Sequence, residues 1–360
     1  MNNKVKELLE LEPYSLEKKE KQTLLTEALK DLTEYHISSC PDYAYMLQAL
    51  GYKKESISTY YNIPMLPVRL YKEYELLSTS RENIKKIMTS SGTSGQSVSK
   101  IFLDARNIKE QSAVLTHIIS SFIGKKRLPM IILDTKLVKK DRKMYSARGA
   151  GITGFSIYGR DIFYALNENM ELDIEGMKEY ISKYQDETIL LFGYTYMIWQ
   201  YVICEMEKHG IQCNINDGIL FHVGGWKKLK AQMVDTITYN AKICSALGNI
   251  KVHNYYGMAE QLGSIYVECE YGHLHCSNYS DVIIRNPKDF SVQSIGEKGL
   301  MELVSVLPTS YPGHVILTED EGEILGEDDC PCGRKGKYFK IHGRIKNAEV
   351  RGCSDTYEKR

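Results

Sequence analysis

The chain has 360 residues, in which 46 lysines and arginines balance 46 aspartates and glutamates to give a formal net charge of zero. A hydrophobic fraction of 43% and a charged fraction of 26% are ordinary for a globular protein and argue against a disordered or fibrous chain. Balanced charge leaves no basic footprint for nucleic acid or an anionic membrane, so we expect neither partner. The length suits one large or two modest domains.

The distribution of apolar residues and cysteines indicates the cellular compartment. The longest uncharged apolar stretches, such as 129–133 and 188–193, are far too short to span a bilayer. Residues 1–22 form a charged amphipathic pattern without the apolar region of a secretory signal, so we expect a cytoplasmic protein. Nine cysteines, an odd number in a long chain, fit reduced thiols, a metal site or a reactive cysteine better than a disulfide framework.

Residues 1–80 are expected to form a small helical N-terminal segment. Apolar residues recur at helical spacing over 15–36 and 42–50, with almost no β-branched runs. Two prolines within 63–67 then bias the chain away from helix and begin an extended connector.

Residues 81–345 are expected to form an α/β domain whose sheet is buried on both faces, because short apolar strands alternate there with long helical patterns. From about residue 299 the pattern becomes β-rich, and residues 346–360 form a short tail. The expected strands are 130–134, 187–192, 218–223, 250–255 and 264–269, and the expected helices are 107–122, 194–209 and 226–243.

The stretch 89–100, TSSGTSGQSVSK, is the most informative segment. Two glycines and five hydroxyl side chains within seven residues cannot fill a core, but they let the backbone approach an anion and offer donors to phosphate oxygens. The alternative is a flexible linker, which is less consistent with the apolar residues on both sides. The pattern of a Walker phosphate loop is missing, so a P-loop ATPase is not supported.

The stretch 149–154, GAGITG, matches the dinucleotide-binding pattern only in its letters. That fingerprint needs an apolar strand directly upstream, and a polar, basic segment stands there instead. We therefore do not interpret these glycines as a dinucleotide site.

Residues 253–261, HNYYGMAEQ, follow an expected strand and combine aromatic rings with a carboxylate. Tyr256 could stack on a purine, and Glu260 could ligate Mg²⁺ beside phosphates. An ordinary strand, glycine turn and helix start would account for the same letters equally well.

Four residues from two distant segments could form a metal site. Cys269 and His275 flank a Gly-His turn, and Cys330 and Cys332 lie on a tight turn. Ligands of this Cys₃His type would make a closed, structural zinc site without an open position for catalysis. Cys276 and His273 are possible substitutes, and buried thiols with a surface histidine are the plain alternative.

Several of these stretches occur together in the order of a known superfamily. TSSGTSG, GGW at 224–226, YYGMAE, TED at 318–320 and GR at 343–344 have the order and approximate spacing of adenylate-forming enzymes. Within that superfamily the chain most resembles the acyl-protein synthetases of the LuxE type, and through CPCGR it is similar to phenylacetate-CoA ligases. The resemblance spans roughly residues 60–355.

The resemblance implies an α/β adenylate-forming large domain with a helical N-terminal segment, a β-rich C-terminal part and no further C-terminal domain. It implies binding of ATP and Mg²⁺. The phosphates would contact Ser90, Ser91, Gly92, Thr93, Ser94 and Gly95. Gly224, Gly225 and Tyr256 would contact the adenine, Gly257 would also bind the nucleotide, and Asp320 would bind both ribose hydroxyls. Arg344 would help to hold the ribose or a phosphate. Glu260 would hold Mg²⁺, and Lys100 stands near the place of the superfamily's loop lysine.

The resemblance also implies a function: ATP-dependent activation of a carboxylic acid, expected to be a fatty acid, as acyl-AMP. The acyl group would pass first to Cys353 and then to an acyl-CoA-reductase-like partner. Gly352 would make the position of Cys353 mobile, and Arg351 would favour its thiolate form. Alternatives are a CoA or carrier-protein ligase and a non-catalytic nucleotide-binding scaffold. The acyl pocket would lie near the aromatic residues of 194–199, unless these belong to the core.

Overall fold

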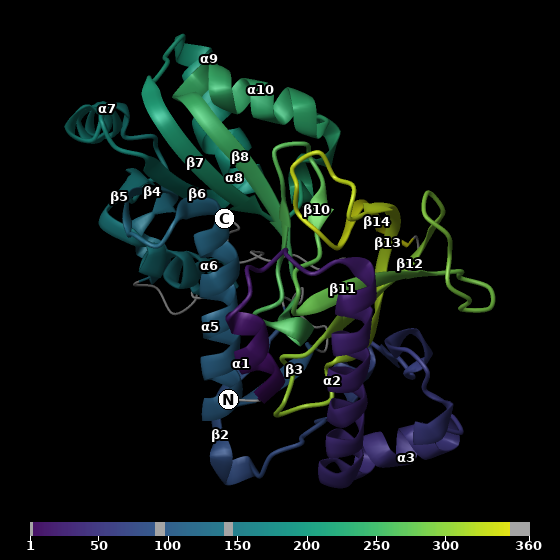
Figure 1. Ribbon diagram of the computed structural model, residues 1–360. Coiled ribbons are helices and arrows are strands. Elements are labelled where there is room, and N and C mark those ends of the chain that lie inside the picture. The colour runs from purple at the N-terminus through teal and green to yellow at the C-terminus, as the bar shows by residue number, and fades with distance from the viewer. Residues whose placement is uncertain (1–2, 91–97, 140–146, 346–360) are drawn as a thin grey trace. The chain divides into compact units, whose positions relative to one another are not determined.

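The computed structural model describes residues 3–90, 98–139 and 147–345 (Figure 1). The described chain divides into two compact units, of which the first holds residues 3–90, 98–122 and 257–345 and the second holds 123–139 and 147–256. Residues 3–80, which we predicted as a segment of their own, therefore share a unit with the C-terminal strands. The predicted tail 346–360 lies outside the described residues.

The second unit is built on five parallel strands in the order β5-β4-β6-β7-β8. Four of them confirm predicted strands, each of which is centred on buried apolar residues. Strand β5 was missed because it lies at the edge, where Arg160 and Asp161 are exposed and interrupt the apolar pattern. The strands are β4 (Leu128–Thr135), β5 (Gly159–Leu166), β6 (Ile189–Tyr194), β7 (Ile215–Val223) and β8 (Gly248–Tyr256).

Helices pack against this sheet, and α10 runs beside β8 (Figure 1). The predicted helix 226–243 is wrong as a continuous element. Asp235 accepts a hydrogen bond from the Thr238 backbone N–H (2.7 Å) and starts a separate helix there. The elements are η4 (Lys136–Lys139), α6 (Ala147–Phe155), η5 (Ser156–Tyr158), α7 (Ile174–Lys183), α8 (Thr195–Met197), η6 (Ile198–Ile203), α9 (Cys204–His209), η7 (Lys227–Gln232) and α10 (Thr236–Leu247).

Two predictions from the sequence concern these helices. The glycines of 149–154 lie inside α6, which agrees with our rejection of a dinucleotide loop. The predicted helix 194–209 is confirmed as α8, η6 and α9 in succession, although its middle turn is π-helical.

The first unit contains an antiparallel sheet in the order β11-β12-β13-β14-β10-β9, with β1 parallel to β13. A separate hairpin pairs β2 with β3. The expected β-rich C-terminal part and the strand predicted at 264–269 are thus confirmed. The strands are β1 (Leu66–Pro67), β2 (Ile84–Thr89), β3 (Lys100–Asp104), β9 (Tyr266–Glu268), β10 (Leu274–His275), β11 (Ser280–Arg285), β12 (Lys298–Ser305), β13 (Val315–Glu327) and β14 (Lys337–Arg344).

The helices of the first unit confirm the predicted helical N-terminus and the helix at 107–122. Pro41 ends α2 and occupies the first turn of α3, where its missing N–H costs nothing. The elements are α1 (Asn3–Leu9), α2 (Lys18–Ser39), α3 (Pro41–Ala49), η1 (Lys54–Ser56), η2 (Tyr60–Asn62), α4 (Leu70–Glu73), η3 (Arg81–Asn83), α5 (Ala105–Ile123) and η8 (Ala259–Gln261). None of the helices in the described ranges has the length and apolar character that crossing a membrane requires.

Buried charges connect the N-terminal helix α2 to the C-terminal strands. The Asp281 carboxylate lies 3.7 Å from Lys21 Nζ and 2.7 Å from Lys337 Nζ, and it also accepts a hydrogen bond from the Tyr60 hydroxyl. Burial opposes ionisation of Asp281, but the two ammonium groups lower its pKa to about 2. The aspartate is therefore charged at neutral pH and cross-links three parts of the unit.

Candidate active site and metal centre

The hydroxyl-rich loop connects the two strands of the β2-β3 hairpin. The Ser90 backbone N–H donates to the Ser99 carbonyl oxygen (3.1 Å), and the Ser99 backbone N–H donates to Ser90 Oγ (2.9 Å). Ser90 is buried, so its side chain closes the base of the loop. The predicted phosphate-binding residues Ser91, Gly92, Thr93, Ser94 and Gly95 lie outside the described residues.

Lys100 begins β3 directly after this loop. Its ammonium lies 3.1 Å from the Glu75 carboxylate, which also binds Arg81 at 2.8 Å. The Lys100 side chain is half-exposed. In the described geometry it is thus one member of a surface ion-pair network, an arrangement that contributes little stability.

Asp320 and Arg344 form a cross-strand pair within the first unit. They are direct partners in the register of β13 and β14, and Arg344 Nε lies 3.5 Å from Asp320 Oδ1. The Asp320 backbone N–H donates to Thr318 Oγ1 (3.1 Å), which fixes the backbone at this position. Two predicted nucleoside ligands that are 24 residues apart in the sequence are therefore adjacent in the sheet.

Glu260 lies in the short helix η8 and has an exposed fraction of 1%. The Tyr311 hydroxyl donates to the Glu260 carbonyl oxygen (3.0 Å), and the Gln261 side-chain amide donates to the carbonyl oxygens of Leu303 (3.1 Å) and Gly313 (2.9 Å). These bonds attach the turn firmly to the antiparallel sheet. The carboxylate predicted to hold Mg²⁺ thus belongs to a rigid segment.

The predicted adenine contacts lie at the carboxyl ends of strands in the second unit. Tyr256 is the last residue of β8, and Gly257 is the first residue of the chain's return to the first unit. Gly224 and Gly225 follow β7, and Gly224 has a φ of +87°, a conformation that favours glycine. In open parallel sheets, ligands bind beyond these strand ends.

Three polar side chains near this strand end were missed. Thr195, His222 and Tyr239 are buried and hydrogen-bonded around the exit of β7. The sequence signal was a histidine inside the apolar strand that precedes the double glycine. The nearby Trp199 packs in the apolar core, which favours the core alternative over an acyl pocket for this side chain.

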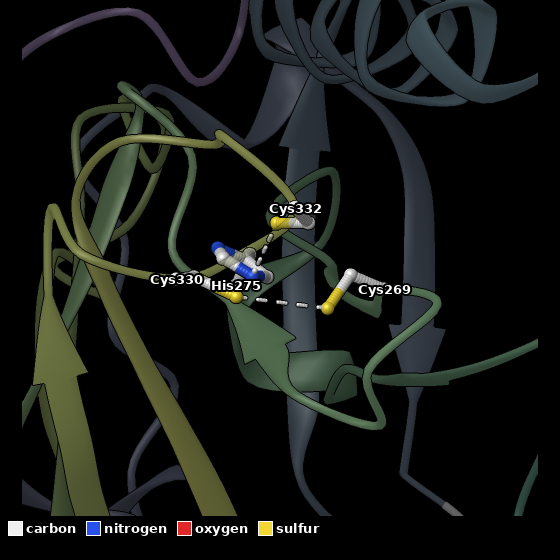
Figure 2. Close-up of side chains that lie close together, drawn as sticks. All are labelled: Cys269, His275, Cys330 and Cys332. Atoms are coloured by element: carbon white, nitrogen blue, oxygen red, sulfur yellow. Dashed lines mark hydrogen bonds between the residues drawn. The ribbon is translucent and has the colours of Figure 1, made fainter.

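All four predicted metal ligands come together in the first unit (Figure 2). One donor atom from each of Cys269, His275, Cys330 and Cys332 lies within 4.8 Å of the others. The sulfurs of Cys269 and Cys330 are 3.9 Å apart, and Cys332 Sγ is 3.3 Å from His275 Nε2. Ligands 2.0–2.3 Å from a tetrahedral zinc would be about 3.5 Å apart, so the donor set fits that ion.

Two tight turns present these ligands. The Gly272 N–H donates to the Cys269 carbonyl (3.0 Å) and the Gly333 N–H donates to the Cys330 carbonyl (2.9 Å), and both glycines have positive φ. The Tyr271 N–H also points at Cys269 Sγ (3.4 Å), a donor that would stabilise a metal-bound thiolate. The four metal ligands could be predicted from the sequence because each of the two turns carries its own cysteine and glycine.

The alternative ligands occupy different positions. His273 Nδ1 is 3.2 Å from Cys330 Sγ, so this imidazole borders the cluster. Cys276 directly follows His275 and is fully buried, and successive side chains point to opposite faces along an extended segment. Its thiol lies near Asp281, whose charge together with burial raises the pKa of Cys276.

The fold is that of the adenylate-forming ligases. An open form of 2-hydroxyisobutyryl-CoA ligase in complex with 2-HIB-AMP and CoA aligns with a TM-score of 0.71 and 14% identity, covering 94% of this chain and 78% of that one. The same ligase in the postadenylation state gives a TM-score of 0.67 with 14% identity, covering 92% and 69%.

The family follows from the sequence. The model of the LuxE acyl-protein synthetases matches residues 3–360, so the chain belongs to this family and is an acid–thiol ligase. It is 22% identical to the long-chain-fatty-acid–luciferin-component ligase of Vibrio harveyi, over 95% of this chain and 89% of the relative. The Aliivibrio fischeri protein of the same name is 21% identical, over 83% and 79%.

Proposed function

We propose that this ligase activates a long-chain fatty acid as its acyl adenylate and transfers the acyl group to its own Cys353. The observation that carries the proposal is the family match over residues 3–360, supported by the names of the two bacterial relatives. Cys353 lies within the matched range but outside the described residues.

In the first step a carboxylate oxygen of the acid attacks the α-phosphorus of ATP. The bond from that phosphorus to the bridging oxygen breaks, and pyrophosphate leaves. Backbone and hydroxyl donors of residues 90–95 would bind the phosphates, and Glu260 would hold Mg²⁺, which would supply positive charge where negative charge develops. The buried, hydrogen-bonded turn of Glu260 supports this role, because a metal ligand on a rigid segment needs no reordering.

Asp320 and Arg344 position the ribose in this proposal. A carboxylate can accept hydrogen bonds from two hydroxyl groups at once, which suits a pair of ribose hydroxyls. The neighbouring guanidinium orients the carboxylate, and the 3.5 Å cross-strand contact supports this arrangement. On the adenine side, Gly224, Gly225 and Tyr256 contribute backbone contacts and a ring face.

In the second step the Cys353 thiolate attacks the acyl carbon. The carbon–oxygen bond to the phosphate breaks, AMP leaves, and a thioester remains on the protein. The thiol proton passes to solvent. An acyl-CoA-reductase-like protein in the cytoplasm would then take up the activated acyl group.

We also propose that the cluster of Cys269, His275, Cys330 and Cys332 holds a structural Zn²⁺. The support is the spacing of its donor atoms and the presentation of the ligands by two glycine turns. Metal analysis should give about one zinc per chain, and Cys330→Ser should lose it. Cys276→Ser, a buried cysteine outside the cluster, is the matched control and should keep the metal; the reverse pattern would refute this ligand set.

The central test uses labelled substrates. Acid-dependent exchange of labelled pyrophosphate into ATP reports the first step, and labelled acid with ATP should then mark the denatured protein. Cys353→Ser should retain exchange but take up no label, whereas Cys244→Ser, which removes an exposed cysteine, should behave as wild type. Label that moves to CoA instead would identify a CoA ligase, and absence of exchange would identify a scaffold.

A further inference from the structure

The turn Gly224–Gly225 is held at both of its ends, within the second unit. Two successive glycines are the most flexible dipeptide that a chain can carry, so on their own they would sample many conformations. The flanking residues Val223 and Trp226 are each fixed by contacts to a different part of the same unit. The turn is therefore restrained by its neighbours and not by its own side chains.

Thr195 holds the first end. Its hydroxyl lies 3.3 Å from the Val223 carbonyl oxygen and 2.9 Å from His222 Nδ1. A carbonyl can only accept, so both contacts are hydrogen bonds when the hydroxyl donates to Val223 and His222 Nδ1–H donates to Thr195 Oγ1. Burial lowers the pKa of His222 to about 3, which keeps the imidazole neutral with one N–H. Both hydrogen bonds are thus satisfied at once.

Aromatic packing holds the second end. The Trp226 ring meets Trp199 edge-on at 5.0 Å and Tyr239 edge-on at 5.8 Å. Tyr239 links the two ends, because its hydroxyl donates to the Thr195 carbonyl oxygen (3.2 Å). Trp199 is itself fixed by its N–H, which donates to Gln232 Oε1 (3.1 Å).

Between these anchors the backbone is left uncovered. A Cβ placed on Gly225 would meet no atom within 4 Å, whereas one on Gly224 would lie 3.5 Å from the Tyr194 ring. Trp199 also lies in the π-helical turn η6, a type of irregularity that occurs mostly at functional sites. A fixed turn with an open face has the geometry of a preorganised backbone site.

We propose that Thr195 and Trp226 are positioning residues that fix the Gly224–Gly225 backbone for contact with the adenine of ATP. This inference rests on the proposed function, because it assumes that the turn binds the nucleotide. Preorganisation lowers the ordering cost of binding, so it should act on ATP affinity and not on the affinity for the acid.

Thr195→Val tests the first anchor, since it keeps the shape of the side chain and removes both hydrogen bonds. We expect its KM for ATP in pyrophosphate exchange to rise about 10-fold, with the KM for the acid unchanged. Thr195→Ser keeps the hydroxyl and should stay within about twofold of wild type. Ile237→Ala, which truncates a side chain exposed by 82% on the same unit, is the control for non-specific effects.

The two tryptophans of the chain, Trp199 and Trp226, provide a direct readout. Titration with MgATP should change their fluorescence, and the midpoint should shift about 10-fold upward in Thr195→Val. If Thr195→Val does not fold, Tyr239→Phe removes only the link between the anchors and should shift the same midpoint upward by about threefold.

Gly225→Ala tests nucleotide binding at the turn separately from the positioning role of its anchors. The added methyl group enters open space in the protein but would obstruct a bound base. Loss of ATP affinity in Gly225→Ala, with unchanged affinity in a folded Thr195→Val or Tyr239→Phe, would overturn the positioning role and leave the nucleotide site intact. Absence of exchange in the wild-type protein would instead refute the proposed function itself.

Discussion

The two compact units position their candidate residues by different means. In the second unit, neutral hydrogen bonds and aromatic packing fix the Gly224–Gly225 turn. The core of this unit is a contiguous set of aliphatic and aromatic side chains, and Asp134–Arg148 is a buried ion pair. In the first unit, charged side chains are fixed by other charges, as in the Lys21–Asp281–Lys337 network. Truncating a side chain in a packed core leaves a cavity, whereas removing one member of a buried charge network leaves an unpaired ion.

This difference suits the two halves of the proposed chemistry. In the proposal, adenine is contacted by a backbone turn that hydrogen bonds and aromatic packing hold in place. Phosphates, Mg²⁺ and ribose need charged or hydroxyl groups, and Glu260, Asp320 and Arg344 all belong to the first unit. Variants that alter charge without altering shape should therefore be most harmful in the first unit.

The largest effect is expected for Glu260→Gln. The amide keeps the shape of the buried side chain but removes the negative charge that would hold Mg²⁺, so pyrophosphate exchange should fall about 1000-fold. The unfolding midpoint should change little, which a thermal melt would check. Exchange within about twofold of wild type would remove Glu260 from the metal site.

Lys337→Met should be the most destabilising of the charge changes. It leaves the buried Asp281 with only the more distant Lys21 ammonium, so the free energy of unfolding should fall by about 3 kcal/mol. Urea unfolding would measure this. Lys340→Met, at an exposed position of the same strand β14, is the matched control and should change stability by less than about 0.5 kcal/mol.

Acid should weaken the first unit through two stacked histidines. His36 and His314 are buried with ring centroids 4.9 Å apart. Burial lowers the pKa of His36 to about 3 and that of His314 well below its usual value, so each is neutral in the fold. Because unfolded histidine titrates near 6.5, protons bind the unfolded chain first, and stability is lost as pH falls below that value.

The size of this loss is about 1.4 kcal/mol per pH unit for each histidine. Unfolding free energies at pH 7.5 and 5.5 would measure it, and the double variant His36→Gln, His314→Gln should show a shallower dependence on pH. An equally steep dependence in the double variant would assign the acid sensitivity to other groups.

The smallest effect is expected for Lys100→Gln. The lysine is half-exposed and paired with Glu75 on the surface, so we expect a loss of less than about threefold in exchange activity and no measurable loss of stability. A loss of 100-fold or more would show that Lys100 leaves Glu75 to contact substrate during the reaction.

The sequence predicted those features whose signals are local. Apolar runs predicted the central strands of the second unit, and paired cysteine and glycine turns predicted the four ligands of the metal cluster. The order of five short motifs predicted the family. Each segment involved is short and reports a local requirement of strand, turn or ligand, and the family signal adds the order of these segments along the chain.

Features that depend on distant partners were missed. Edge strand β5 has no continuous apolar run, and the network of Lys21, Asp281 and Lys337 joins side chains up to 316 positions apart. The role of Thr195 depends on its contact with the exit of β7, 28 residues further on. Single charged or hydroxylated residues in a sequence do not identify their partners, because pairing is decided by the fold.

The most direct test of the account is exchange of labelled pyrophosphate into ATP by the purified chain, with Mg²⁺ and a series of long-chain fatty acids. We predict exchange that requires both the acid and the metal and that disappears in Glu260→Gln. A wild-type protein that binds no ATP and exchanges no label with any acid would contradict the proposal that this chain joins fatty acids to AMP.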